Sequence, residues 1–113
     1  MLLNINRMLS MDIKNRIKEQ LEAHSVLLYM KGTPDFPQCG FSGQTVSVLK
    51  TLEQPFSYVN ILEDSEIREG LKIYSNWPTF PQLYINGELI GGCDIIMEMY
   101  QSGELATLIS DIK

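Results

Sequence analysis

Val26-Leu-Leu-Tyr-Met30 is an unbroken apolar run that leads, through the loop Lys31-Gly-Thr-Pro-Asp-Phe-Pro-Gln38, into Cys39-Gly-Phe-Ser42. A continuous apolar run of this length is typical of a strand that is buried on both faces. The residues that follow the two prolines of the loop predict a helix over residues 40–52. This part of the chain therefore predicts a strand, a loop and a helix in succession, with a cysteine at the start of the helix.

The remaining segments supply further helices and strands. Helices are predicted at residues 12–24, 65–74, 95–101 and, after a break at Gly103, up to residue 112, and strands at residues 56–60, 82–85 and 88–91. Asp12 and Asp94 are predicted to cap two of these helices, because a carboxylate accepts hydrogen bonds from the free N–H groups of a helix start. Asn86-Gly87 is a strong signal for a two-residue hairpin turn, so the last two strands are expected to be antiparallel.

The order of these elements predicts an α/β fold with one mixed sheet. A strand–helix–strand unit places strands 26–30 and 56–60 parallel to one another, and the hairpin adds an antiparallel pair. We therefore expect a four-stranded mixed sheet with helices on both faces. The 113 residues suffice for one domain, which we place at residues 11–113. Residues 1–10 are expected to form a flexible N-terminal extension outside this domain.

Composition and charge narrow the classes of function. The chain carries a net charge of −5 and no cluster of lysine and arginine, so nucleic acid is not expected as a partner. No run approaches the roughly 18 apolar residues of a membrane span, so no membrane partner is expected either. Two cysteines are too few for a secreted disulfide scaffold. A reducing compartment, the cytoplasm, fits this composition.

Cys39 is the strongest candidate for a chemically active residue. The unpaired N–H groups and the positive dipole end of a helix start lower the pKa of a thiol, and the nearby Lys31 adds a full positive charge. A thiolate formed in this way is a nucleophile and a ligand for soft metals. Ser42 stands where a Cys-x-x-Cys redox pair would have its second cysteine. Cys39 therefore lacks the neighbour with which it would form such a disulfide.

Three further residues keep two interpretations each. Lys31 is either a solvated surface lysine or a clamp for an anion that also stabilises the thiolate. Phe41 suits a core position and an exposed contact with a partner equally well. Cys93 is either a small buried residue or the disulfide partner of Cys39.

Two further motifs are suited to a peptide-like ligand. Thr79-Phe80-Pro81 precedes a strand, and a cis bond before Pro81 would turn the backbone of Phe80 outward, where an extended peptide can pair with it. Gly91-Gly92-Cys93-Asp94 is explained by a turn and a helix cap. The same motif offers bare N–H groups and a carboxylate, which suit the charged groups at the two ends of an amino acid.

Four motifs occur together in one order and spacing: Lys31-Gly32, Cys39-Gly-Phe-Ser42, Tyr74-Ser-Asn-Trp-Pro-Thr-Phe-Pro-Gln-Leu-Tyr84 and Gly91-Gly-Cys-Asp94. With this combination the chain resembles the monothiol (CGFS-type) glutaredoxins over residues 12–112, and most of all their short, single-domain bacterial type. The resemblance implies a thioredoxin-like fold with a cis bond before Pro81, and a groove for glutathione.

The resemblance also implies roles for single residues around the thiol. Cys39 would be the active thiol of the protein. Lys31 and Arg68 would hold the glycine carboxylate of glutathione. Arg68 enters only through the resemblance, because its spacing alone does not distinguish it from a surface charge on a helix.

The rest of the implied groove comes from the second half of the chain. The backbone of Phe80, next to the cis Pro81, would pair with the cysteinyl part of glutathione, and Trp77 would line the groove. Cys93, through its backbone, and Asp94 would receive the γ-glutamyl end.

Members of the family that the chain resembles handle [2Fe–2S] clusters, and counting thiolates supports the same function. Such a cluster takes four ligands, commonly thiolates. One chain offers one exposed cysteine, Cys39, so two chains and two glutathione thiolates complete the set in a homodimer with two-fold symmetry. The implied partners are BolA-like proteins and apo iron–sulfur clients. The implied role is iron–sulfur cluster assembly and transfer, with iron homeostasis.

Two other functions compete with a cluster carrier. A monothiol is sufficient for a glutathione-dependent thiol–disulfide oxidoreductase that removes glutathione from mixed disulfides, because a second glutathione resolves the Cys39–glutathione intermediate. A structural thioredoxin-fold module without activity is the third function considered, and the presence of Lys31, Cys39, Arg68 and Asp94 disfavours it.

Overall fold

The computed structural model describes residues 10–112. Its helices and strands are α2 (Met11–Ala23), β1 (Val26–Met30), α3 (Gly40–Thr51), β2 (Ser57–Asn60), α4 (Ser65–Ser75), β3 (Gln82–Ile85), β4 (Glu88–Gly91), α5 (Cys93–Ser102) and α6 (Glu104–Ser110). Each predicted helix and strand is present, with ends shifted by two residues or fewer. Within residues 10–112, no helix has the length and apolar character that crossing a membrane requires.

The strands form one four-stranded sheet in the order β2-β1-β3-β4. β1 pairs with β2 in parallel, as expected for strands joined by a helical crossover, here α3. β1 pairs with β3, and β3 with β4, in antiparallel register. The predicted mixed α/β sheet and the predicted Asn86-Gly87 hairpin are therefore both confirmed.

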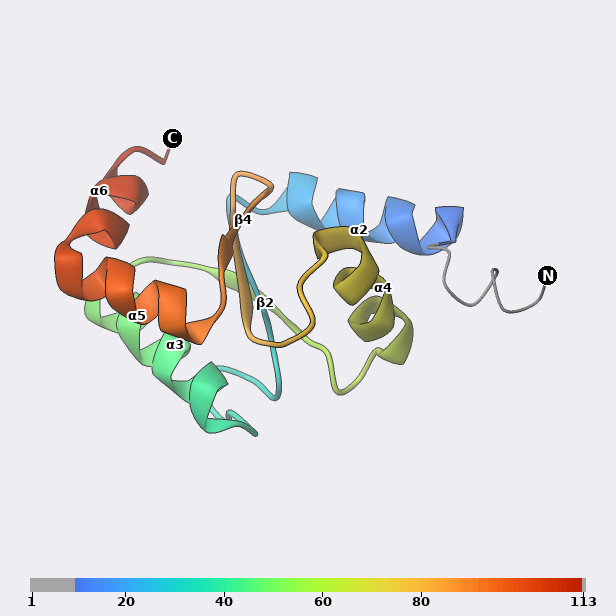
Figure 1. Cartoon of the computed structure of the whole chain (residues 1–113), viewed down its shortest axis with the longest axis horizontal. Coiled ribbons are helices and arrows are strands. Elements are labelled where there is room, and N and C mark those ends of the chain that lie inside the picture. The colour runs from blue at the N-terminus through green and yellow to red at the C-terminus, as the bar shows by residue number, and fades with distance from the viewer. Residues whose placement is uncertain (1–9, 113) are drawn as a thin grey trace.

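Helices cover both faces of the sheet, which is also as predicted. Figure 1 shows α3, α5 and α6 on one side of the strands and α2 with α4 on the other. The apolar side chains of β1 alternate between these two layers: Leu27 and Tyr29 belong to the cluster under α2 and α4, and Leu28 and Met30 to the cluster under α3 and α5. All five residues of β1 are buried, because each face of this central strand meets a layer of helices.

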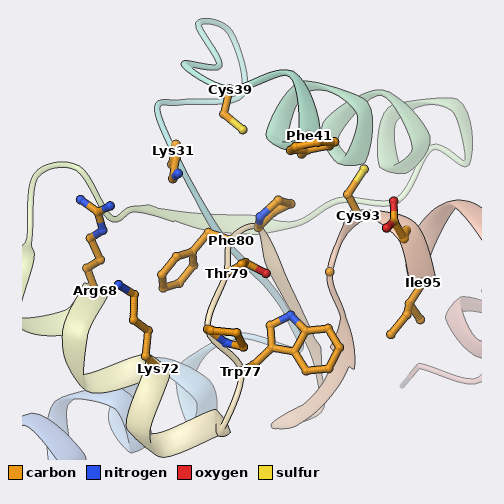
Figure 2. A pocket seen from close by; sticks show the side chains of 14 residues that line it. Lys31, Cys39, Phe41, Arg68, Lys72, Trp77, Thr79, Phe80, Cys93 and Ile95 are labelled. Atoms are coloured by element: carbon orange, nitrogen blue, oxygen red, sulfur yellow. The ribbon is translucent and has the colours of Figure 1, made fainter.

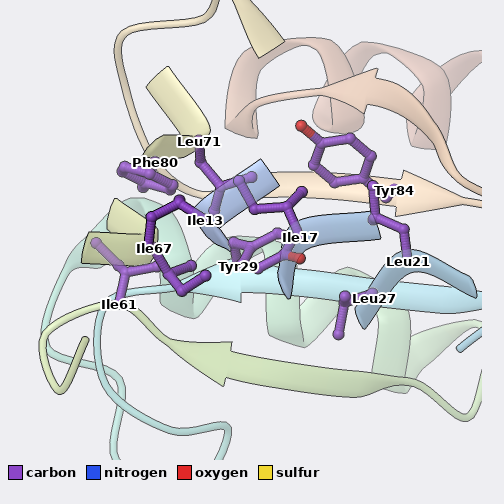
Figure 3. Close-up of a cluster of buried hydrophobic side chains, with 10 residues drawn as sticks. All are labelled: Ile13, Ile17, Leu21, Leu27, Tyr29, Ile61, Ile67, Leu71, Phe80 and Tyr84. Carbon is purple, nitrogen blue, oxygen red and sulfur yellow. The ribbon is translucent and has the colours of Figure 1, made fainter. Parts of the chain in front are cut away.

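The cluster under α2 and α4 explains how these two helices are attached (Figure 3). The side chains of Ile13, Ile17 and Leu21 lie one helical turn apart on α2 and are buried. They pack with Ile67 and Leu71 of α4 over the sheet. The helices therefore dock through one apolar stripe each, and α4 is held close to the edge of the sheet where β3 begins.

The register of the strands brings three segments to one edge of the sheet. Tyr29, near the end of β1, pairs with Gln82, the first residue of β3. Leu83 pairs in turn with Gly91, the last residue of β4. The loop before α3, the loop before β3 and the start of α5 therefore meet at this edge, although they are far apart in the sequence.

Two predicted helix caps are wrong. α2 begins at Met11, and its N-cap is Ser10, whose Oγ accepts a hydrogen bond from the backbone N–H of Ile13 at 3.2 Å. Asp12 lies in the first turn of this helix. Ser10, which the sequence places in the extension, thus contributes to the domain, and residues 1–9 of the predicted extension lie outside the described residues.

The second correction concerns α5. This helix begins at Cys93, two residues earlier than predicted, with Gly92 as its N-cap. Asp94 therefore lies in the first helical turn, where its side chain is exposed to solvent. Its carboxylate is available to a ligand, because the side chain is exposed and Gly92, not Asp94, is the N-cap.

Candidate functional site

A cleft of about 560 Å³ opens at the edge of the sheet where these segments meet (Figure 2). It is lined by Lys31, Cys39, Phe41, Arg68, Lys72, Trp77, Pro78, Thr79, Phe80, Pro81, Gly92, Cys93, Asp94 and Ile95. Every site residue predicted from the sequence is among these lining residues. The structure thus brings together, in one cleft, residues from three helices and two loops.

Cys39 lies at the N-cap position of α3 and is partly exposed. The backbone N–H of Ser42 is the largest cause of a lowered pKa of this thiol. Partial burial opposes the change, and the N–H of Phe41, the positive charge of Lys31 and the Ser42 hydroxyl support it. The uncharged thiol makes no capping hydrogen bond, so these N–H groups act by stabilising the thiolate. The lowered pKa agrees with the prediction, and the N–H groups of the helix start lower it more than the charge of Lys31 does.

Ser42 ties the helix start to the end of β1. Its side chain is fully buried, and its Oγ accepts a hydrogen bond from the backbone N–H of Lys31 at 3.2 Å. This contact fixes the position of Lys31 relative to Cys39 and explains why both residues face the same cleft. From the sequence, Lys31 is either a solvated surface lysine or an anion clamp beside the thiolate. Its place in the lining of the cleft favours the second interpretation.

Cationic side chains gather at one end of the cleft. Arg68 and Lys72 come from α4, four residues apart and hence on one face of the helix, and they lie on the same side of the cleft as Lys31 in Figure 2. Arg68 Nε is buried without a hydrogen-bond partner among the described residues. Lys72 Nζ is 3.2 Å from a carboxylate oxygen of Glu69. This end of the cleft is suited to an anion such as a carboxylate.

Sequence reasoning missed Lys72 and Thr79 as lining residues. Lys72 carries a readable signal, since a position four residues after Arg68 shares its helix face. Thr79 stands within a motif of which only Trp77, Phe80 and Pro81 were predicted as site residues, and its exposed side chain reaches the cleft because of the bend before β3.

The opposite end of the cleft is the start of α5. The first N–H groups of a helix have no partner within the helix, and here they follow Gly92, which has no side chain to cover them. Cys93 is buried, and its Sγ donates a hydrogen bond to Oε1 of Gln44 at 3.2 Å. Both thiols are free. Of the two interpretations of Cys93, the structure therefore has the small buried residue and not the disulfide partner of Cys39. Burial raises the pKa of the Cys93 thiol.

The loop before β3 forms the floor between these two ends. The peptide bond between Phe80 and Pro81 is cis, as the resemblance implies. The ring of Phe80 packs in the core under α2 and α4. Trp77 is partly buried, and its Nε1 makes no hydrogen bond among the described residues. This N–H is buried and lies against the start of α5, since a Cβ added at Gly92 would be 3.3 Å from Nε1.

Phe41 is 59% exposed, which excludes the core position that the sequence left open. It stands on the first turn of α3, two residues after Cys39, and lines the same cleft (Figure 2). An exposed aromatic ring at this place adds apolar surface to the rim of the cleft.

Comparison with known proteins gives one consistent family. The glutaredoxin profile matches residues 26–90. Glutaredoxin 4 of Pasteurella multocida (strain Pm70) is 53% identical over 102 residues, which are 90% of this chain and 94% of that protein. The mitochondrial monothiol glutaredoxin-5 of Lachancea kluyveri is 50% identical over 111 residues, 96% of this chain and 78% of that protein.

A solved structure shows the same fold. The solution structure of reduced poplar apo GrxS14 is 56% identical and superimposes with a TM-score of 0.76, covering 87% of this chain and 90% of that one. The predicted thioredoxin-like fold, with its four-stranded mixed sheet and helices on both faces, is therefore confirmed. Together with the single cysteine of the motif at residues 39–42, these similarities show that the chain belongs to the glutaredoxin family as a short monothiol glutaredoxin.

Proposed function

We propose that this protein binds glutathione in the cleft beside Cys39 and carries a [2Fe–2S] cluster that bridges two copies of the chain. The observation that carries the proposal is a single accessible thiol with a lowered pKa, that of Cys39, at the rim of a cleft with cationic groups at one end and a helix start at the other.

The shape and charges of the cleft suit a tripeptide with a charged group at each end. A volume of about 560 Å³ lies in the range of small-molecule sites. Arg68 and Lys31 provide positive charge for the glycine carboxylate of glutathione. In this pose the cysteinyl part lies between them and the start of α5, along the backbone of Phe80 and Pro81 and beside Trp77.

The γ-glutamyl end has both an acid and an amine to bind. At the start of α5, free N–H groups suit its α-carboxylate, and the exposed carboxylate of Asp94 suits its ammonium group. Cys93 contributes its backbone N–H to this set, and its thiol stays with Gln44. The thiol of glutathione is then directed toward Cys39.

The chemistry of the sulfur atoms favours a shared cluster as cargo. Metal ligation requires the thiolate, which is favoured at Cys39 and disfavoured at the buried Cys93. One chain therefore supplies one good thiolate ligand, and a [2Fe–2S] cluster takes four. Two chains and two bound glutathiones complete the set in a closed homodimer. Because half of these ligands are exchangeable small molecules, such an assembly suits the transfer of a cluster to another protein.

The cellular part of the proposal follows the family. We place the protein in the cytoplasm, with iron–sulfur cluster assembly and iron homeostasis as its role. BolA-like proteins and apo iron–sulfur proteins are its proposed partners.

A second function is favoured by the accessibility of the same sulfur. The thiolate of Cys39 attacks the glutathione sulfur of a protein–glutathione mixed disulfide, and the protein thiolate leaves. A second glutathione thiolate then attacks the Cys39–glutathione disulfide, which releases oxidised glutathione and restores Cys39. This oxidoreductase cycle needs one cysteine per chain.

Anaerobic reconstitution with iron, sulfide and glutathione separates the two functions. The wild-type protein should become brown with visible absorption bands, and Cys39→Ser should stay colourless. Cys93→Ser is the matched control, since it changes the other cysteine of the chain, and it should retain most of the colour. A wild-type protein that stays colourless while it rapidly removes glutathione from a mixed disulfide would instead support the oxidoreductase.

A further inference from the structure

Gln82 is a polar residue in a position where the fold places apolar side chains. It is the first residue of β3, and its side chain has no exposure to solvent. Successive side chains of a strand alternate in direction, so Gln82 lies on the same face as Tyr84, which packs in the core under α2 and α4. A buried amide costs stability unless its hydrogen bonds are made within the protein.

The hydrogen bonds of Gln82 are made to the loop that forms the floor of the cleft. Its Nε2 donates to the carbonyl oxygen of Trp77 at 3.1 Å and to that of Thr79 at 3.2 Å. Its Oε1 accepts a hydrogen bond from the hydroxyl of Tyr84 at 3.1 Å. Two carbonyl acceptors and one hydroxyl donor fit a single orientation of the amide.

The loop from Trp77 to Pro81 has few other ways to hold its shape. Two of its residues are prolines, which have no N–H to donate. At its first residue, the N–H of Trp77 donates to Oγ of Ser75 at 3.1 Å, and the Ser75 hydroxyl makes a longer contact of 3.5 Å with the carbonyl oxygen of Trp77. The amide of Gln82 therefore supports the middle of the loop, where Thr79 and Phe80 face the cleft.

We propose that Gln82 is a positioning residue for glutathione binding: from inside the core, its amide holds the carbonyls of Trp77 and Thr79, so that the indole and the backbone of Phe80 stay in the geometry that the ligand requires. This inference rests on the proposed binding of glutathione in the cleft. Gln82 does not line the cleft, so it acts through the loop and not by touching the ligand.

Gln82→Met is the direct test, because methionine has a similar length and no hydrogen-bond donor. The carbonyl of Thr79 loses its partner, and that of Trp77 keeps only the long contact with the Ser75 hydroxyl at 3.5 Å. The loop then samples conformations that do not fit the ligand. We expect the Kd for glutathione, measured by isothermal titration calorimetry, to rise about tenfold. Tyr29→Phe is the matched control. It removes a part-buried hydrogen bond elsewhere, from the Tyr29 hydroxyl to Oε1 of Gln20 at 2.8 Å, and keeps both hydrogen bonds from Gln82 to the loop.

The chain also contains an internal reporter of loop geometry. Trp77 is its single tryptophan, so intrinsic tryptophan fluorescence reports on this loop alone. In the folded Gln82→Met protein the emission maximum should move relative to wild type, and in Tyr29→Phe it should not. The thiol pKa of Cys39 should be the same in both variants, because its causes lie in α3 and Lys31.

The outcomes separate the inference from the proposed function. If the wild-type protein does not bind glutathione, the proposed function and the inference on Gln82 are both wrong. If wild type binds and Gln82→Met binds equally well, or if Tyr29→Phe weakens binding as much, Gln82 is not a positioning residue and the proposed function stands. If Gln82→Met does not fold, Tyr84→Phe provides the test, since it removes only the hydroxyl that orients the amide. About threefold weaker binding is expected there, and unchanged binding with unchanged emission contradicts the inference.

Discussion

Cys39 shows how a single residue acquires its reactivity from backbone geometry. The N–H groups of the first turn of α3 favour its thiolate more than the charge of Lys31 does. A sequence shows that a cysteine precedes a helix, and this part of the site was predictable. Which of the two causes is larger depends on how the thiol sits against the N–H groups, and only the folded structure contains that information.

The titration of Cys39 is the first prediction at the residue scale. The thiolate, followed by its ultraviolet absorption near 240 nm, should form at a lower pH than in an unfolded cysteine peptide. Lys31→Gln should raise this pKa and leave it below the peptide value, because the helix start remains. The same variant should weaken glutathione binding about fivefold to tenfold, as expected for a lost charge-assisted contact. A pKa in Lys31→Gln equal to that of the peptide would contradict this assignment.

The ion pair between Arg16 and Asp64 gives a second prediction at this scale. Asp64 caps α4 through the backbone N–H of Ile67, at 3.1 Å, and pairs with Arg16 of α2. The hydrogen bond from Arg16 is the largest cause of a lowered pKa of Asp64. A lowered pKa stabilises the folded state above the unfolded pKa of about 4, and this contribution is lost as the pH falls through the folded value.

Two substitutions of Asp64 separate its cap from its charge. Asp64→Ala should reduce the free energy of unfolding at pH 7 by about 1–2 kcal/mol, and Asp64→Asn, which keeps a capping oxygen, by about 0.5 kcal/mol because the pair is partly exposed. In urea titrations, the difference between wild type and Asp64→Asn should shrink as the pH is lowered below about 4. A difference that stays constant down to the acid range would rule out a role for the charge.

At the scale of elements, the sequence predicts which helices and strands exist better than where they begin. The apolar run of β1 and the Asn86-Gly87 turn are local signals, and both were reliable. Signals for helix starts were less reliable. Ser10 and Asp12 are both good capping residues, and the docking of α2 on the sheet decides in favour of Ser10. For α5, the close packing of Gly92 against the loop before β3 sets the start.

The packing of Gly92 yields a prediction at the element scale. A methyl group at this position would lie 3.3 Å from the carbonyl oxygen of Pro81 and 3.3 Å from Nε1 of Trp77. The backbone of Gly92 is extended, so the substitution causes crowding and no backbone strain. Gly92→Ala should therefore push α5 and the loop apart, weaken glutathione binding about tenfold and shift the fluorescence of Trp77.

Gly43 provides the matched control for this substitution. It lies inside α3, and an added methyl group would make ordinary contacts with Pro37 at 3.7 Å. Gly43→Ala should leave glutathione binding unchanged and stabilise the protein by up to about 1 kcal/mol, because alanine favours a helix. Equal binding by Gly92→Ala and wild type would show that the start of α5 tolerates displacement and does not define the ligand site.

At the scale of the whole molecule, the cleft concentrates positive charge on an acidic protein. The chain has a net charge of −5, whereas Lys31, Arg68 and Lys72 line one end of the cleft. Composition alone predicts an unremarkable acidic surface. The local reversal follows from folding, since β1 and α4 come together only through the docking of α4 on the sheet.

Salt dependence tests this arrangement of charge. Raising the ionic strength from about 0.05 M to 0.5 M should weaken glutathione binding several-fold, because screening acts on partly exposed charges. An analogue with an amide in place of the glycine carboxylate should bind more weakly and lose most of this salt dependence. If the analogue binds as tightly as glutathione and with the same salt dependence, the cationic end does not hold the glycine carboxylate.

The proposed homodimer depends on a set of four thiolate ligands, two from Cys39 and two from glutathione, and one measurement tests this composition directly. Wild-type protein loaded anaerobically with iron, sulfide and glutathione is analysed by native mass spectrometry together with its absorption spectrum. The account predicts a coloured species with two chains, two glutathiones and one [2Fe–2S] cluster, which dissociates into colourless monomers when the cluster is removed. A cluster held by one chain, or by two chains without glutathione, would contradict it.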